Sequence, residues 1–215
     1  MRKGHLISFE GLDGAGKTTQ LDLLERWLDA HDVDYIRTRE PGGTPLGVEI
    51  RQLLFSHPEL TVTPLAEAFL FQADRAQHFA TVIEPALDAG TLVISDRCLD
   101  SSIAYQGVAR GVGPECIERL SLLATQGRVP DLTILLDLEP TQVQVRTAIV
   151  HDQSGRRKVP SRFDRESEQF HRSLRGAFLA LAKAHPERIK VIDAGQPIEC
   201  VHEQIVRLVE QLHHR

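Results

Sequence analysis

Cysteine is scarce in this sequence, and the three that occur, Cys98, Cys116 and Cys200, lie far apart with no C-x-x-C pair among them. This spacing excludes a zinc ribbon and a disulfide-stapled scaffold, and it fits a protein of a reducing cytoplasm. Long hydrophobic runs are missing as well, since no apolar stretch approaches the ~20 residues that a membrane-spanning helix needs. The first residues lead into an apolar segment without the core of a signal peptide. We therefore expect a cytoplasmic protein with no membrane partner.

The sequence also lacks an excess of positive charge, with 25 lysines and arginines against 30 aspartates and glutamates and a formal net charge of -5. Such a surface does not attract nucleic acid or an anionic membrane by charge alone. We expect no nucleic-acid partner, so any anion site has to be local. At 215 residues, 41% of them apolar, the chain suffices for a full core, and we expect a single domain over residues 1–215.

Residues 11–18 fit the phosphate-loop pattern G-x-x-x-x-G-K-[ST] without a gap or a substitution. The apolar run at 6–9 predicts a buried strand before the loop, and leucines at helical spacing over 19–30 predict a helix after it. An incidental glycine-rich turn would not explain these flanks. The glycines allow successive N–H groups to point at one anion, and the helix start adds its positive end.

The loop therefore predicts a nucleoside triphosphate site. Lys17 is expected to reach the β- and γ-phosphates, and the Thr18 hydroxyl is expected to bind magnesium. The contacts to the triphosphate are predicted to come from Gly11, Leu12, Asp13, Gly14, Ala15, Gly16, Lys17 and Thr18.

Strand and helix patterns alternate over the rest of the chain. Apolar runs predict further strands at 33–37, 92–95, 132–138 and 188–192, and helical spacing predicts helices at 46–55, 64–89, 112–126, 166–184 and 198–212. Pro85 predicts a kink or a break in the long helix, and another helix is expected after Pro140. This alternation predicts a parallel α/β sandwich, in which ligands gather at the carboxyl ends of the strands.

The densest positive charge lies at 146–165, where six basic residues and two acids give a net charge of +4. The basic residues are Arg146, Arg156, Arg157, Lys158, Arg162 and Arg165. A charge run is often only a solvated face of a helix. Because this segment is polar, contains Gly155 and belongs to a phosphate-binding chain, we predict a mobile lid that closes over phosphate.

Five motifs together resemble bacterial thymidylate kinases and span most of the chain. They are residues 9–19, Arg-Glu-Pro-Gly-Gly-Thr at 39–44, Phe71 with Arg75, Asp96 with Arg97, and Asp-Ser-Ser-x-Ala-Tyr-Gln-Gly at 100–107. The resemblance implies a magnesium-dependent enzyme that transfers the γ-phosphate of ATP to dTMP, giving dTDP for dTTP synthesis. It also implies a homodimer and a three-layer α/β sandwich of the nucleoside monophosphate kinase type, with a five-stranded parallel sheet.

The resemblance also implies roles for individual residues in binding dTMP. Phe71 is expected to stack on thymine and Arg75 to contact the base or the phosphate, since residues four apart share a helix face. By spacing alone Phe71 has a second interpretation, as core beside its apolar neighbours. The other dTMP contacts implied are Arg39, Arg51 and Arg97 at the acceptor phosphate, Ser102 and Gln106 at the pyrimidine edge, and Tyr105.

The catalytic residues that the resemblance implies are Lys17, Asp13, Arg97, Arg156, Arg157 and Arg162. Asp13 lies inside the phosphate loop, where a carboxylate needs a compensating cation, and a lid arginine is a candidate for it. Asp96 is expected to join Thr18 as a magnesium residue, through a metal-bound water. The alternative for Asp96 is an ion pair that anchors Arg97.

Two other functions remain open. A phosphate-loop kinase could act on a deoxynucleoside or on a different monophosphate, although Arg39, Arg75 and Arg97 favour an acceptor that already carries a phosphate. A nucleotide switch or ATPase that acts on a protein partner would need no pyrimidine pocket. The Asn-Lys-x-Asp sequence of many guanine-binding switches is absent.

Overall fold

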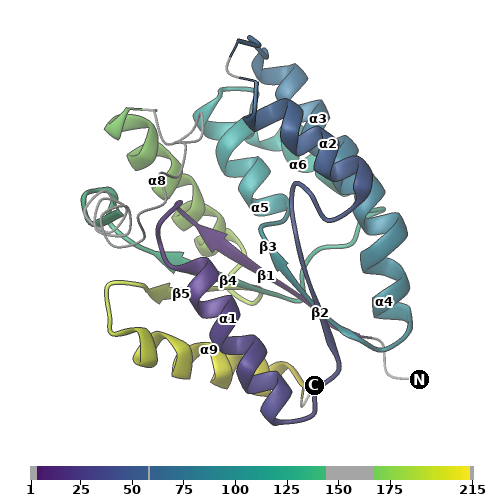
Figure 1. The fold of residues 1–215 in the computed structure, drawn as a ribbon. Coiled ribbons are helices and arrows are strands. Elements are labelled where there is room, and N and C mark those ends of the chain that lie inside the picture. Colours follow the sequence, from purple (N-terminus) through teal and green to yellow (C-terminus); the bar gives the residue numbers. More distant parts are fainter. Residues whose placement is uncertain (1–3, 58, 144–166, 214–215) are drawn as a thin grey trace.

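The computed structural model describes residues 4–57, 59–143 and 167–213 (Figure 1). Five strands form one sheet in the order β2-β3-β1-β4-β5, and every neighbouring pair is parallel. The strands are β1 (Leu6–Gly11), β2 (Tyr35–Arg39), β3 (Leu92–Asp96), β4 (Leu132–Asp137) and β5 (Ile189–Asp193). Helices cover both faces of this sheet, so the predicted three-layer α/β sandwich is confirmed.

The helices include two segments with the wider π-helical hydrogen bonding, η1 and η2. The helical elements are α1 (Lys17–Ala30), α2 (Pro45–Phe55), α3 (Pro64–His78), η1 (Phe79–Ile83), α4 (Glu84–Asp88), α5 (Leu99–Ser102), η2 (Ile103–Ala109), α6 (Pro114–Ala124), α8 (Glu168–Ala184) and α9 (Ile198–His213). Among these described helices, none combines the length and the apolar character of a membrane span.

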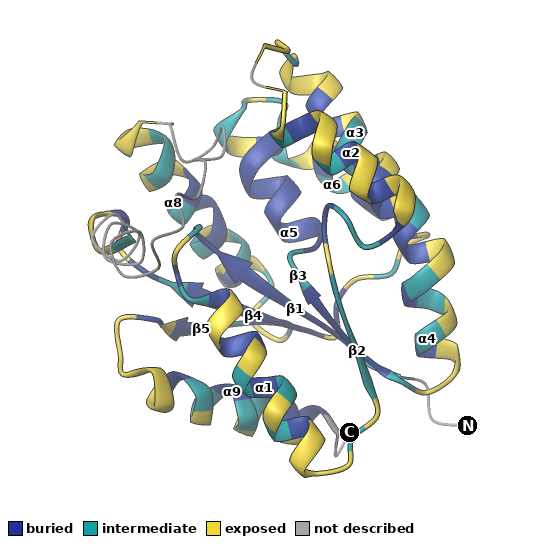
Figure 2. Cartoon of the chain, viewed as in Figure 1, coloured by how far each residue is buried: buried dark blue, intermediate teal, exposed yellow. Residues whose placement is uncertain are grey.

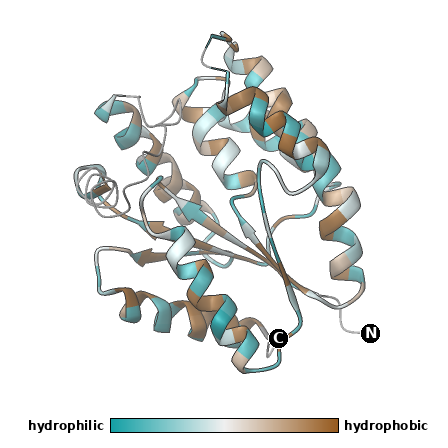
Figure 3. Cartoon of the chain, viewed as in Figure 1, coloured by the Kyte–Doolittle hydropathy of each residue, from teal (hydrophilic) through white to brown (hydrophobic). Residues whose placement is uncertain are grey.

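The core lies on both sides of the sheet. On one side α1 and α9 pack side by side, and Leu24 and Ile205 from them are fully buried in one cluster with Ile7 and Phe9 of β1. The strands β1, β3 and β4 are buried along most of their length (Figure 2), and they are mainly hydrophobic, with hydrophilic residues toward their carboxyl ends, as the teal head of β1 shows in Figure 3. Strands buried on both faces read as continuous apolar runs, which is why the sequence pattern located them.

The opposite side of the sheet is covered by α3, η1, α4, α6 and α8. Alternate residues of the strands face this side, so that Leu6 and Val93 join a cluster with Phe79 and Ile117. A third cluster joins α8 to β4, through Phe178 and its neighbours. The sheet is thereby held rigidly beneath the loops that follow its strands.

The long helix predicted at 64–89 is interrupted, as Pro85 indicated. Helix α3 ends at His78, and in η1 the N–H of Glu84 bonds to the carbonyl of Phe79, five residues back. Pro85 then lies in the first turn of α4, where a missing N–H costs little. The predicted interruption is confirmed, and it takes the form of a π-helical turn.

The helical segment formed by α5 and η2 was missed by the sequence patterns. Its residues from 99 to 107 are all buried, so no polar face alternates with an apolar one to mark a helix. Residues 140–143 are helical, as predicted after Pro140. The predicted lid at 146–165, with Arg156, Arg157 and Arg162, lies outside the described residues.

Candidate active site

The phosphate loop leaves the carboxyl end of β1, at the centre of the sheet. At Gly11 the backbone has φ of 130°, and a Cβ there would lie 2.4 Å from the carbonyl oxygen of Leu136 on β4. Gly14 and Gly16 also have positive φ, and Gly16 is the N-cap of α1. Positive φ angles favour glycine at these positions, and the turn that they allow brings the start of α1 to the site.

Lys17 begins α1 and folds its side chain back over the loop. Its Nζ donates to the carbonyls of Gly11 at 3.1 Å and Leu12 at 3.0 Å, and it lies 3.7 Å from Asp13. Burial, and next the charge of Arg97, lower the pKa of this ammonium group. Lys17 is therefore held where a phosphate bound by the loop would meet it.

Arg97 comes directly after β3 and joins that strand to the phosphate loop. Its Nη2 donates to Asp13 Oδ1 at 2.6 Å, and its Nη1 donates to Ser101 Oγ at 2.8 Å and to the Gly11 carbonyl at 3.2 Å. Burial opposes the charge, but Tyr105 and Asp13 raise the pKa of Arg97 well above its ordinary value. Among the described residues, Arg97 and Lys17 are the cations beside the Asp13 carboxylate.

Tyr105 lines the other side of Arg97. The guanidinium carbon lies 5.2 Å from the centre of the Tyr105 ring, and Nη2 lies 3.3 Å from the hydroxyl oxygen, to which it donates. Tyr105 is buried. Its predicted role toward dTMP remains a prediction; its ring also meets those of Phe170 and Phe178 edge-on, each at 6.4 Å.

Glu10 was missed as a site residue, although an acid inside an apolar strand signals a buried partner. Its side chain is fully buried in β1, and its Oε1 accepts the Cys98 N–H at 2.8 Å and the Ser101 N–H at 3.3 Å. Its Oε2 accepts the Ser101 hydroxyl at 2.5 Å. Because Ser101 also accepts from Arg97, Glu10 sets the position of that guanidinium.

This carboxyl group leads to a prediction about pH. Burial, with the charge of Asp100 second, raises the pKa of Glu10 from 4.5 to about 7. Between these values the folded protein holds a proton that the unfolded chain has released, so this group's contribution to stability falls as pH rises. The melting temperature of the wild type minus that of Glu10→Gln is expected to decrease from about pH 5 to about pH 7. Thermal unfolding in a pH series measures it, and a difference independent of pH would contradict the shift.

The loop after β2 brings two arginines together. Gly42 has φ of 114°, and a Cβ there would lie 3.3 Å from Arg39 Nε and 3.3 Å from Arg51 Cδ. Arg51 donates to the carbonyl of Pro41 at 3.0 Å, and burial and then the charge of Arg39 lower its pKa. Two arginines that both pack against Gly42 favour the binding of an anion beside them. This geometry supports the predicted acceptor-phosphate site at Arg39 and Arg51.

Two buried acids, Glu40 after the edge strand β2 and Asp74 on α3, hold this loop in place. The sequence patterns assigned no role to either of them. Asp74 Oδ1 accepts the Gly42 N–H at 3.0 Å, and burial and the nearby charge of Glu40 raise the pKa of Asp74 to about 6. Glu40 in turn accepts from Arg75 at 2.8 Å and is joined to His78 at 3.1 Å. Asp74 therefore holds the loop through a hydrogen bond made from the protein interior, and Glu40 ties the loop to Arg75 and His78.

Arg75 is almost wholly buried, at 1% exposed. Besides Glu40, it donates through Nη1 to Gln72 at 2.9 Å and through Nη2 to Ser102 at 3.0 Å. Its predicted contact with the base or the phosphate of dTMP remains a prediction. The structure brings Arg75 to the predicted pyrimidine edge, at Ser102.

Phe71 is half-buried on α3, one turn before Arg75. Its ring meets that of Phe55 edge-on at 6.5 Å, and Arg51 lies over the Phe55 ring at 5.1 Å. Phe71 belongs to none of the three core clusters among the described residues. This placement favours the stacking interpretation over the core interpretation.

Thr18 and Asp96 are the residues predicted to hold magnesium. Thr18 is exposed in the first turn of α1, and Asp96 ends β3, where its Oδ1 is buried without a hydrogen-bond partner among the residues that the structure describes. For the alternative role of Asp96, the structure gives no contact within 4.0 Å between the Asp96 and Arg97 side chains, although the charge of Asp96 helps to raise the pKa of Arg97. The described residues hold no group of three metal-binding side chains. One hydroxyl and one carboxylate fit Mg²⁺, which takes its other ligands from phosphates and water.

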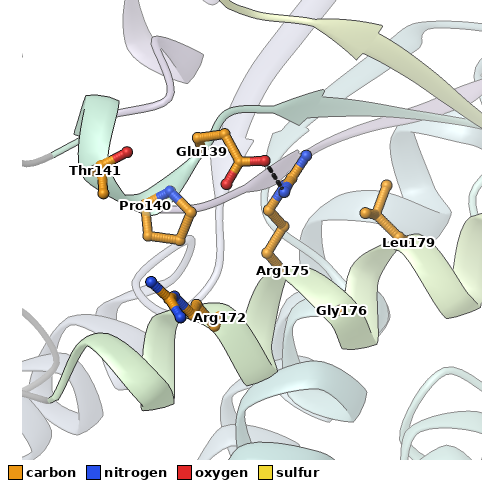
Figure 4. Close-up of a pocket in the computed structure, with 7 residues that line it drawn as sticks. All are labelled: Glu139, Pro140, Thr141, Arg172, Arg175, Gly176 and Leu179. Atoms are coloured by element: carbon orange, nitrogen blue, oxygen red, sulfur yellow. Dashed lines mark hydrogen bonds and ion pairs between the residues drawn. The ribbon is translucent and has the colours of Figure 1, made fainter.

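A cavity of about 280 Å³ lies between the end of β4 and α8, beside Arg172 and Arg175 (Figure 4). Arg175 donates to both oxygens of Asp137 at 2.7 and 2.8 Å and also contacts Glu139, while Arg172 donates to Glu168 at 2.6 Å. The charges of both arginines are thus compensated. This cavity therefore has less uncompensated positive charge for binding a phosphate than the region of Arg39 and Arg51.

A phosphate loop follows the central strand, and a second group of arginines, Arg39, Arg51 and Arg97, comes at or after the ends of β2 and β3 on one side of it. This combination is typical of a phosphate-loop kinase of the nucleoside monophosphate kinase type. The sequence model of one such family, thymidylate kinase, matches residues 9–205. The chain belongs to the thymidylate kinase family.

Individual relatives agree with this assignment. The thymidylate kinase of Leifsonia xyli subsp. xyli is 48% identical over 198 residues, which cover 92% of this chain and 90% of the relative. Thymidylate kinases of a Marinomonas species and of Bifidobacterium longum are 43% and 45% identical, covering 98% and 97% of this chain and 96% and 98% of the relatives. The similarity thus extends over nearly the whole chain, and the resemblance drawn from the five motifs is confirmed.

Proposed function

We propose that this chain transfers the γ-phosphate of ATP to dTMP, giving dTDP and ADP. The observation that carries the proposal is Arg97, which joins the phosphate loop at Asp13 and lies close enough to Arg51 for its charge, like that of Arg39, to act on it. Donor and acceptor anions would meet around this one guanidinium group. The names of the relatives support thymidylate as the acceptor.

The reaction needs positioning and charge neutralisation, without a covalent enzyme intermediate. Backbone N–H groups of the loop and Lys17 hold the ATP phosphates, and Arg39 and Arg51 hold the acceptor phosphate. Arg97, which contacts the loop and acts by charge on Arg51, stabilises the charge on the transferring group. Thr18 and Asp96 would hold Mg²⁺, which when bound would neutralise charge on the β- and γ-phosphates.

A coupled assay for ADP tests the proposal. The panel comprises dTMP, dUMP, dCMP, AMP, thymidine and a sample without acceptor, each with Mg²⁺ and with excess EDTA. We expect ADP release with dTMP and Mg²⁺ to exceed that of every other arm. A higher rate with thymidine or AMP would indicate the rival kinases, and equal rates with and without acceptor would indicate an ATPase.

The base pocket gives a prediction for Phe71. Phe71→Ala is expected to weaken dTMP binding by about 1–3 kcal/mol, the contribution of one aromatic stack on a base, and to leave ATP binding nearly unchanged. Phe71→Tyr keeps the ring and is expected to retain most of the affinity. Titration calorimetry with each nucleotide measures both. Weaker ATP binding with intact dTMP binding would place Phe71 in the donor site.

The proposal extends to assembly and location. Leu65 and Phe69 lie one turn apart on α3 and are 48% and 53% exposed. Apolar side chains presented in this way favour contact with a second copy of the chain, and light scattering is expected to give the mass of a homodimer.

Cys98, Cys116 and Cys200 are free thiols, in keeping with a reducing cytoplasm.

A further inference from the structure

Glu67 on α3 and Gln106 on η2 form a buried polar pair. Gln106 Nε2 donates to Glu67 Oε1 at 2.7 Å, and Glu67 Oε2 lies 3.9 Å from Arg110 Nε. Glu67 and Gln106 are 0% and 1% exposed. A carboxylate in such a place is costly unless hydrogen bonds and a cation compensate it. The sequence motifs assign Glu67 no role that would account for this cost.

The pair fixes which way the Gln106 amide points. An ionised carboxylate only accepts hydrogen bonds, whereas an amide has a donating and an accepting end. Gln106 therefore has to turn its NH₂ toward Glu67, and a flipped amide would bring two oxygens to 2.7 Å from each other. The Oε1 of Gln106 consequently points away from Glu67, and it makes no hydrogen bond to any residue that the structure describes.

The position of this oxygen follows from the packing of α3 on the segment formed by α5 and η2. Phe71 lies one turn after Glu67 on α3, and Arg75 lies one turn further on. Arg75 contacts Ser102 at 3.0 Å, and Ser102 lies one turn before Gln106. The contacts of Glu67 with Gln106 and of Arg75 with Ser102 therefore bracket Phe71. A pyrimidine stacked on that ring would have an edge within reach of Gln106.

We infer that Glu67 is a positioning residue that holds the Gln106 amide with its oxygen toward the base, and thereby selects pyrimidines that carry an N3–H. This inference rests on the proposed function. Thymine and uracil have an N3–H that donates to an oxygen, whereas cytosine has a lone pair at N3 and would face it with a second acceptor. A site built around one fixed acceptor discriminates strongly between the two patterns.

The test compares dTMP with dCMP in Glu67→Gln, which keeps the shape of the side chain. An amide side chain at position 67 both donates and accepts, so it pairs with either end of the Gln106 amide. The orientation of Gln106 is then no longer fixed. The ratio of kcat/KM for dTMP to that for dCMP is expected to fall at least about tenfold, through KM for dTMP more than through kcat. Glu115→Gln removes the same charge from an exposed position on α6 and is expected to leave the ratio unchanged.

A double-mutant cycle separates positioning from general packing. If Glu67 acts through Gln106, then in a Gln106→Ala background Glu67→Gln is expected to leave the ratio unchanged. An unchanged ratio in folded Glu67→Gln, or an equal fall in both backgrounds, would overturn the inference. Glu67→Asp, whose carboxylate is withdrawn by one methylene, replaces Glu67→Gln if that variant does not fold, and the same outcomes apply. A wild type inactive on dTMP would instead contradict the proposed function.

Discussion

Lys17→Ala is expected to lower kcat by roughly 10³-fold or more, because it removes a cation from the transferring phosphate, where even one lost donor costs about 10²–10³. The melting temperature is expected to change little. The side chain makes two hydrogen bonds to the carbonyls of Gly11 and Leu12, and bonds of this kind contribute only about 0.5–1.5 kcal/mol each. Turnover at saturating substrates and circular dichroism are to be measured on the same sample.

Lys190→Ala provides the matched control for Lys17. Lys190 also donates from its ammonium group to a backbone carbonyl, that of Pro186 at 2.6 Å, but it lies on β5 away from the phosphate loop. We expect full activity from this variant. An active Lys17→Ala, or one that is inactive because it is unfolded, would remove the support for Lys17 as a catalytic group.

Arg97→Ala is expected to lower kcat by about 10²–10³-fold, since under the proposed function it removes a preorganised donor to the transferring phosphate. Arg97→Lys restores the charge but not the fork that reaches Asp13 and Ser101 together, so it is expected to recover only part of the loss. Steady-state kinetics at saturating ATP and dTMP measure the effect on kcat apart from the effect on KM.

Arg37→Ala separates the site from the general effect of losing an ion pair. Arg37 lies on β2 and contacts Asp22 at 2.6 Å and Glu25 at 2.5 Å, much as Arg97 contacts its partners. Because such a partly exposed pair adds at most about 1 kcal/mol, this variant is expected to keep its kcat and nearly all its stability. An equal loss of kcat in Arg37→Ala and Arg97→Ala would show that Arg97 has no special place in the reaction.

The phosphate loop and the strands could be predicted because their physics is local in the chain. The glycines at 11, 14 and 16 are required by the positive φ angles of those same residues, and β1, β3 and β4 are continuous apolar runs. The pattern failed where burial is uniform, at residues 99–107, because a helix without a polar face carries no period.

The supporting acids could not be predicted from the sequence because their partners are distant in the chain. Glu10 accepts from Ser101, 91 residues away, and Glu67 accepts from Gln106, 39 residues away. Only the fold brings these residues together. The one local signal was an acid among apolar neighbours, which indicates a buried partner but does not identify it.

The bond between Asp13 and Arg97 has a thermodynamic consequence. It joins the phosphate loop to the end of β3 at 2.6 Å, and under the proposed function these two segments meet the donor and the acceptor phosphate. A phosphate that binds at either site would compete with Asp13 for the Arg97 guanidinium. It would thereby change the electrostatic potential at the other site. Linkage then requires reciprocity: whatever factor ATP imposes on the dissociation constant of dTMP, dTMP imposes on that of ATP.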